Sequence, residues 1–169
     1  MSTVATSNRH VASYLSDHLA GAAGAISMMQ HIETVYAGAD VAAVVAAVRK
    51  EVEEDRDQLE RLAAMLGVEV STPRKVVGWA GEKMAEVKLG LDDSHRGALH
   101  LLEALDGLAM GIDGKLALWQ GLDAAATDTP VLRSLDYDRL SKRAQDQRQR
   151  IEPSRLAAAR ALFQADKVS

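Results

Sequence analysis

The chain of 169 residues contains no cysteine, few aromatic residues and only three prolines. Without cysteine there is no disulfide, no thiolate ligand for zinc and no cysteine nucleophile. Aromatic residues make up 4% of the chain. This composition is typical of a helical protein whose core is built from alanine, valine, leucine and methionine. The length suits one domain with a sizeable core, which we place at residues 8–169 after a flexible tail of residues 1–7.

The sequence also lacks a basic excess and a long apolar run. Its net charge is −4 and its isoelectric point lies near 5.7, which argues against a general nucleic-acid binder. No run reaches the roughly 18 apolar residues of a membrane span, and the polar start has no signal-peptide core. There is no phosphate-binding glycine loop and no zinc-ligand spacing. We therefore expect a cytoplasmic protein that binds neither membranes nor nucleic acid.

The most regular pattern lies in residues 40–67. Apolar residues fall on one stripe with alternating steps of four and three, which predicts a long amphipathic helix with one buried seam. The seam residues are Val41, Val45, Val48, Val52, Leu59, Leu62 and Leu66. Asp55 occupies the one remaining seam position. An acid there either binds a ligand or is neutralised by a partner.

The sequence also predicts the ends of this helix and the positions of three further helices. We expect Asp40 to be the N-cap of this helix and Gly67 its C′ glycine. A first helix should run from about residue 8 to 36, with a middle of glycine and alanine that lets another helix approach closely. A third should span residues 93–125. A fourth should open at Thr129 and Pro130 and kink or restart at Pro153.

Four such helices predict an all-α, antiparallel four-helix bundle. The connection over residues 68–93 is long, and Thr72 followed by Pro73 predicts a short extra helix within it. A bundle with one long crossover has the ferritin-like topology. The second helix is acidic and the last is basic, with seven Lys/Arg against four Asp/Glu over residues 137–166. We expect these two helices to be neighbours.

Three segments resemble a known group, the small bacterial stress-associated ferritin-like proteins. VRKEVEEDRDQLERLAAMLG is similar to the second helix of that group, and YLSDHLAGAAGAISMM and HLLEALDGLAMGIDGK extend the resemblance more weakly. The resemblance implies a site for two metal ions, with one carboxylate from each of two helices and carboxylate–histidine pairs from the other two. The positions that match supply a set of candidate iron or manganese ligands. They are Glu51, Glu54, Asp55, Glu103, Asp106 and Asp146, to which we add His18 as a nitrogen ligand.

The sequence also departs from the family pattern. The first helix carries Ala22, Ala23 and Ala25 where a glutamate is expected, and neither the second nor the fourth helix contains histidine. Our first hypothesis is therefore a bundle that has lost its metal site and has no cofactor. In that case Asp55, Glu103 or Asp106 would pair with basic groups, for which the candidates are His18, Lys115, Arg143 and Arg150. The role would then be stress-associated or interaction-based, without catalysis.

Other hypotheses stay open on the sequence alone. The carboxylates provide enough oxygen donors for an altered Fe or Mn site with oxidase or storage chemistry. A buried carboxylate could instead serve a non-metal enzyme as general acid or base. The glycine- and alanine-rich middle of the first helix could leave a cavity for a small ligand. A homodimer or an unidentified protein partner is consistent with alanine-rich helical faces.

Overall fold

The computed structural model describes residues 2–70 and 94–164, with side chains described for 8–70 and 97–164. In these segments the chain is helical and contains no strand. Four long helices account for most of it: α1 (Ser2–Val35), α2 (Asp40–Met65), α4 (Ser94–Ala125) and α5 (Tyr137–Gln164). A short 3-10 helix, η1 (Pro130–Ser134), precedes α5. The short helix expected near Thr72 lies outside the described residues.

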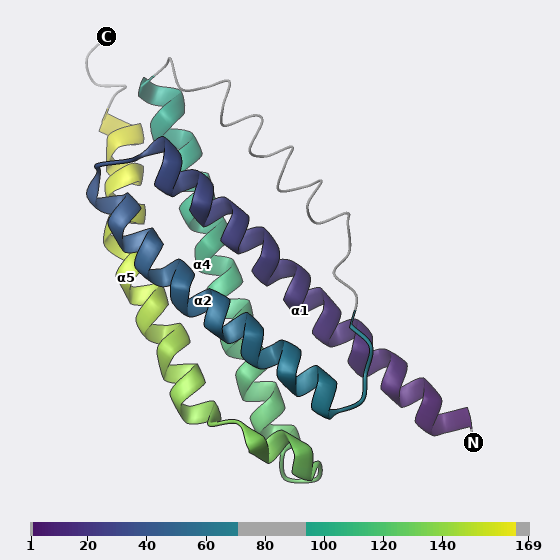
Figure 1. The fold of residues 1–169 in the computed structure, drawn as a ribbon. Helices are drawn as coiled ribbons and strands as arrows, with labels where there is room; N and C mark the ends of the chain where they lie inside the picture. Colours follow the sequence, from purple (N-terminus) through teal and green to yellow (C-terminus); the bar gives the residue numbers. More distant parts are fainter. Residues whose placement is uncertain (1, 71–93, 165–169) are drawn as a thin grey trace.

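The helices pack side by side with their long axes roughly aligned (Figure 1). The main contacts join α1 to α2, α2 to α5, α5 to α4, and α4 to α1, so that α2 and α4 lie diagonally opposite. The hydroxyl of Tyr36, just after α1, donates to the carbonyl of Gly97 at the start of α4, at 3.0 Å. Figure 1 shows that the chain reverses direction between α1 and α2 and again between α4 and α5, whereas α2 and α4 run in the same direction.

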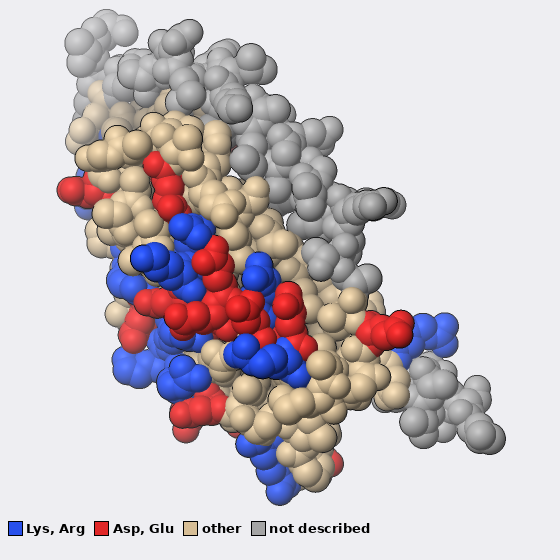
Figure 2. Space-filling view, in the orientation of Figure 1, with Lys and Arg blue, Asp and Glu red and all other residues tan. Residues whose placement is uncertain are grey.

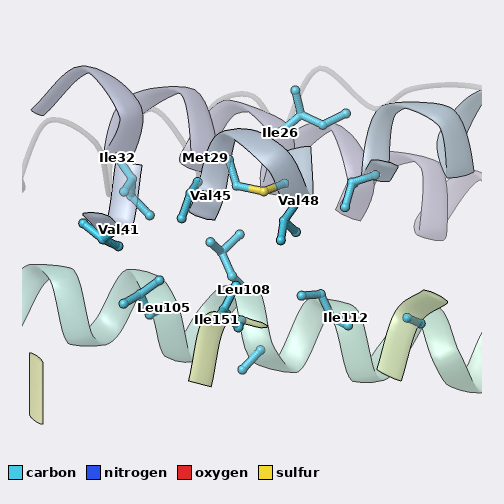
Figure 3. Packing of buried hydrophobic residues seen from close by; sticks show 13 residues of the cluster. Ile26, Met29, Ile32, Val41, Val45, Val48, Leu105, Leu108, Ile112 and Ile151 are labelled. Atoms are coloured by element: carbon cyan, nitrogen blue, oxygen red, sulfur yellow. The ribbon is translucent and has the colours of Figure 1, made fainter. Parts of the chain in front are cut away.

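The seam predicted for residues 40–67 is buried from Val41 to Leu62, and Leu66 at its end is partly buried. Val45, Val48 and Leu62 are each 1% exposed or less, and Asp55 is 2% exposed. Figure 3 shows the valines of α2 and Met29 of α1 directed toward the apolar side chains of α4. One apolar cluster fills the end of the bundle around Met29, and a second surrounds Trp119 at the other end. Asp55 lies on α2 between these two clusters.

The ends of α2 follow local backbone chemistry. Gly67 has φ +66°, and its N–H donates to the Ala64 carbonyl while that of Val68 donates to Ala63. This is a Schellman motif, so the prediction of a C′ glycine is confirmed. The prediction for Asp40 is wrong, because Ala39 holds the N-cap position and Asp40 is the first helical residue. There its charge still favours the positive end of the helix dipole.

Two other boundaries differ from expectation. α1 begins at Ser2, so residues 2–7, expected in a tail, are helical. α5 begins at Tyr137, after η1, and continues through Pro153 instead of restarting there. Gln149, whose carbonyl loses its helical partner at this proline, is exposed, as is Pro153 itself. Water can therefore satisfy that carbonyl.

No helix within the described ranges is both long and apolar enough to cross a membrane.

Candidate functional site: a buried ion-pair cluster and an adjoining cavity

Asp55 lies at the centre of a polar cluster that crosses the bundle. The Lys115 ammonium donates to Asp55 Oδ2 at 2.6 Å, reaching from α4 across the diagonal to α2. Arg143 of α5 donates to the other carboxylate oxygen, Oδ1. The side chains of Lys115 and Arg143 are 13% and 16% exposed. Both oxygens of a nearly inaccessible acid are therefore satisfied by cations from two other helices.

Gln147 extends this cluster along α5. It is fully buried, accepts a hydrogen bond from Lys115 through Oε1, and donates through Nε2 to Glu51 at 3.0 Å. Glu51 also accepts from Arg150. The buried amide links the central lysine to a carboxylate near the surface of α2. Its position on the polar seam of the last helix is the only sequence signal for this role.

The surface above the cluster carries a second layer of charge. Arg143 also donates to Glu54 at 2.8 Å, and Arg139 donates to Gln58 at 3.3 Å. Acidic and basic side chains gather over the middle of α2 and α5, whereas the lower part of this face is mostly uncharged (Figure 2). The prediction that the acidic second helix and the basic last helix are neighbours is confirmed.

The environment of the cluster shifts two pKa values. Burial lowers the pKa of Lys115 below its ordinary value, although the charge and hydrogen bond of Asp55 oppose this shift. For Glu51, burial alone would raise the pKa. Hydrogen bonds from Arg150 and Gln147 and the charges of Arg150 and Arg143 outweigh burial, so the pKa of Glu51 is lowered.

The other candidate ligands lie elsewhere. Glu103 is largely exposed, with His100 Nδ1 3.8 Å away, and Asp106 accepts from Arg155 of α5 at 3.0 Å. Neither makes an ion pair or hydrogen bond with the groups that hold Asp55, so these two acids lie outside the ion-pair cluster. Glu103 precedes Lys115 by twelve residues, which separates them by about 18 Å along α4.

Asp146 and His18 are also separate from the ion pairs of Asp55. Asp146 binds Lys142 one turn earlier on α5, at 3.2 Å. His18 is half-buried and packs edge-on against Tyr14, with ring centroids 4.7 Å apart. Burial lowers the pKa of His18, and the neighbouring Asp17 partly opposes this shift. In the described part of the chain, no three His, Asp or Glu side chains come together as a metal-binding group.

These positions provide a poor fit to two metal ions. A cation bound at Asp55 would have to displace the ammonium of Lys115 and the guanidinium of Arg143. Glu51 is held by Gln147 and Arg150, and Asp106 by Arg155. Glu54 and Asp146 pair with Arg143 and Lys142. The chain's own cations thus hold five of the six candidate carboxylates.

A cavity of about 210 Å³ adjoins the cluster. It is lined mainly by α1, α2 and α4 and opens to the surface beside Gly21 and Gly111, which are exposed, and Asp55 and Lys115 form part of its wall. Most of its lining is apolar, and the small residues of α1 that line it include Gly21, Ala22 and Ala25. At Gly21 the expectation of close helix approach is wrong, because a Cβ there would meet no atom of the described residues within 4 Å. Sequence reasoning allowed for a cavity in this region but did not identify Gly111, Gly114 or Trp119 as part of it.

No protein-family model, curated protein or solved structure matches this chain.

Proposed function

We propose that this chain is a ferritin-like bundle in which ion pairs occupy the place of a di-metal centre. It acts by binding other molecules in a stress-associated role and does not catalyse a reaction. The resemblance of residues 48–67 to the second helix of ferritin-like proteins supports the family. The common direction of α2 and α4 is what a single long crossover between them requires.

The observation that carries this proposal is the contact between Lys115 and Asp55. In a ferritin-like protein the carboxylates at the middle of the bundle hold metal ions. Here the ammonium lies 2.6 Å from Asp55 Oδ2, and Arg143 takes the other oxygen. An ammonium and a metal ion compete for the same carboxylate, because both depend on its negative charge.

Binding to another protein is consistent with the apolar side chains that remain at the surface. Tyr14, Met110 and Phe163 are large and exposed, with Met110 and Phe163 each 70% exposed. A second copy of the chain or a different protein could cover them. Such an interaction is part of the proposed role.

Metal analysis tests the absence of a di-metal centre. The full chain is purified without chelator, loaded separately with Fe(II) in air and with Mn(II), and desalted. Metal per chain is then measured by inductively coupled plasma mass spectrometry. We expect well under one ion per chain, and no ferrous oxidation faster than in buffer.

Two variants make this result specific. Asp55→Asn removes the central charge, whereas Asp128→Asn removes an exposed charge outside the cluster. One or two ions per chain in the wild type and Asp128→Asn, but not in Asp55→Asn, would overturn the proposal in favour of an altered Fe or Mn site. That result would support oxidase or metal-storage chemistry instead.

A further inference from the structure

The cavity beside Asp55 has the size of a small-molecule site. Its volume of about 210 Å³ exceeds the engineered cavity of about 150 Å³ that binds benzene in another helical protein. The walls include Met29, Val52, Leu108 and Leu118, so most of the lining is apolar. A single aromatic ring with a short substituent would occupy such a space.

Glycines around this cavity are not explained by helix packing. Gly21, Gly111 and Gly114 all lie inside helices, where glycine is less favourable than alanine. A glycine is usually kept inside a helix when a neighbouring backbone leaves no room for Cβ. At these three positions a Cβ would meet no atom of the described residues within 4 Å. Gly21 and Gly111 are exposed and line the cavity, so a larger residue there would narrow its opening.

Among the described residues, three hydrogen-bond donors in the wall lack a full set of acceptors. The indole Nε1 of Trp119 and Nε of Arg56 are buried without a hydrogen-bond partner there, and Trp119 is only 1% exposed. The Lys115 ammonium has three N–H groups, and Asp55 and Gln147 accept two of them. All three residues line the cavity. An unsatisfied buried donor is unfavourable, so a ligand that offers an acceptor gains by filling this space.

The charges in the wall favour an uncharged ligand. Among the lining residues, Asp17 and Asp55 balance Arg56 and Lys115. Asp55 and Arg56 also have ion-pair partners outside the wall, so the charges are already compensated. A buried carboxylate ligand would add a charge with no counterion of its own. A carbonyl oxygen would accept a hydrogen bond without this cost.

We propose that the cavity binds a small uncharged molecule, of the size of one aromatic ring, that carries a carbonyl oxygen. The ring packs against the apolar side chains, and the carbonyl accepts from Trp119 or Lys115. This binding activity goes beyond the proposed loss of the metal centre. Metal content and ligand binding are measured separately, so either one can fail without the other.

The test uses three probes of similar size: acetophenone, ethylbenzene and benzoate. Ethylbenzene lacks the acceptor, and benzoate adds a charge. The chain has two tryptophans, so its amide NMR spectrum contains two indole N–H signals, and Trp79→Phe identifies that of Trp119. We expect acetophenone to raise Tm and to shift the Trp119 indole or Lys115 ammonium signal. Ethylbenzene should bind about three- to tenfold more weakly, and benzoate should not bind measurably.

Cavity variants locate the binding. Ala22→Leu fills the cavity from α1 and should weaken acetophenone binding at least tenfold, whereas Ala47→Leu adds the same side chain at an exposed position of α2. Gly21→Ala adds only a methyl group and should also weaken acetophenone binding. This variant serves as the test if Ala22→Leu does not fold. Failure of acetophenone to bind would overturn the proposal. So would binding that survives both cavity variants, or ethylbenzene binding equal to that of acetophenone.

Discussion

The two sides of the bundle differ at the level of Asp55. Between α2 and α5, long polar side chains fill the seam, and Asp55 has a cation on each oxygen. Between α1 and α4, glycine and alanine leave a cavity, and the buried indole N–H of Trp119 has no acceptor within the described segments. Lys115 borders both regions. The long polar side chains between α2 and α5 thus specify how these two helices pair. The short side chains between α1 and α4 leave a space available to a ligand.

The largest expected effect comes from removing the central acid of the ion-pair cluster between α2 and α5. Asp55→Ala leaves two cations buried without their carboxylate, and we expect a loss of about 3–5 kcal/mol in the free energy of unfolding. Urea denaturation followed by circular dichroism measures this loss. The matched change is Glu54→Ala, at the adjacent acid, whose side chain is 66% exposed and whose ion pair contributes about 0–1 kcal/mol.

Combining Asp55→Ala with Lys115→Met distinguishes the loss of the Asp55–Lys115 ion pair from a general disruption of packing. Because the two residues share one interaction, the double variant should lose less stability than the sum of the single variants, by about 0.5–3 kcal/mol. Additive losses, or a cost for Asp55→Ala no larger than that of Glu54→Ala, would contradict a stabilising role for the cluster.

Two glycine substitutions should have smaller effects. The first lies beside the cavity, and the second, at the end of α2, provides the contrast. Gly111→Ala places a methyl group in open space within a helix and should stabilise the protein by about 0.5–1 kcal/mol. Gly67→Ala should destabilise it by about 1–2 kcal/mol, because φ is +66° there. Thermal and urea unfolding of the two variants measure the contrast. Destabilisation by Gly111→Ala would mean that this position is tightly packed.

The sequence predicted the helices and the burial of Asp55 because both follow from periodicity. Seven apolar positions at steps of four and three leave one orientation for α2, and that orientation buries Asp55 with them. The sequence offers Lys115 and Arg143 as candidate partners of Asp55 because each is a basic residue on another helix of the bundle. Whether Lys115 and Arg143 or instead His18 and Arg150 pair with Asp55 depends on the rotation and register of the helices, which composition does not determine.

Other features depended on packing that sequence does not specify. Glu103 and Asp106 follow a stripe beside the α4 seam, and a small rotation of the helix decides whether such a stripe faces inward. Glu103 is exposed, whereas Asp106 is half-buried and pairs with Arg155 of α5, so the stripe lies at the edge of the helix contact and does not reach Asp55. Gly21 and Ala22 are equally compatible with close helix contact and with a cavity. Only the separation of α1 from α4 distinguishes these outcomes.

The smallest expected effect concerns ion pairs on the surface, which provide the counterpart to the buried cluster. Glu152 accepts hydrogen bonds from Arg155, at 2.7 Å, and from Arg148, and these lower its pKa to about 2. Since the folded pKa lies below the ordinary value of 4.5, this contribution to stability is present above pH 4.5 and is lost as pH falls toward 2.

Glu152→Gln should therefore lower the urea midpoint slightly at pH 7, and the difference from wild type should shrink between pH 4.5 and 2. Urea titrations at several pH values measure it, with Glu69→Gln as the control, because Glu69 is exposed and has no ion pair among the described residues. Added salt should reduce the Glu152 effect, since exposed charges are screened, but should change the Asp55 effect much less. Equal salt sensitivity at both positions would contradict the distinction between surface ion pairs and the buried cluster.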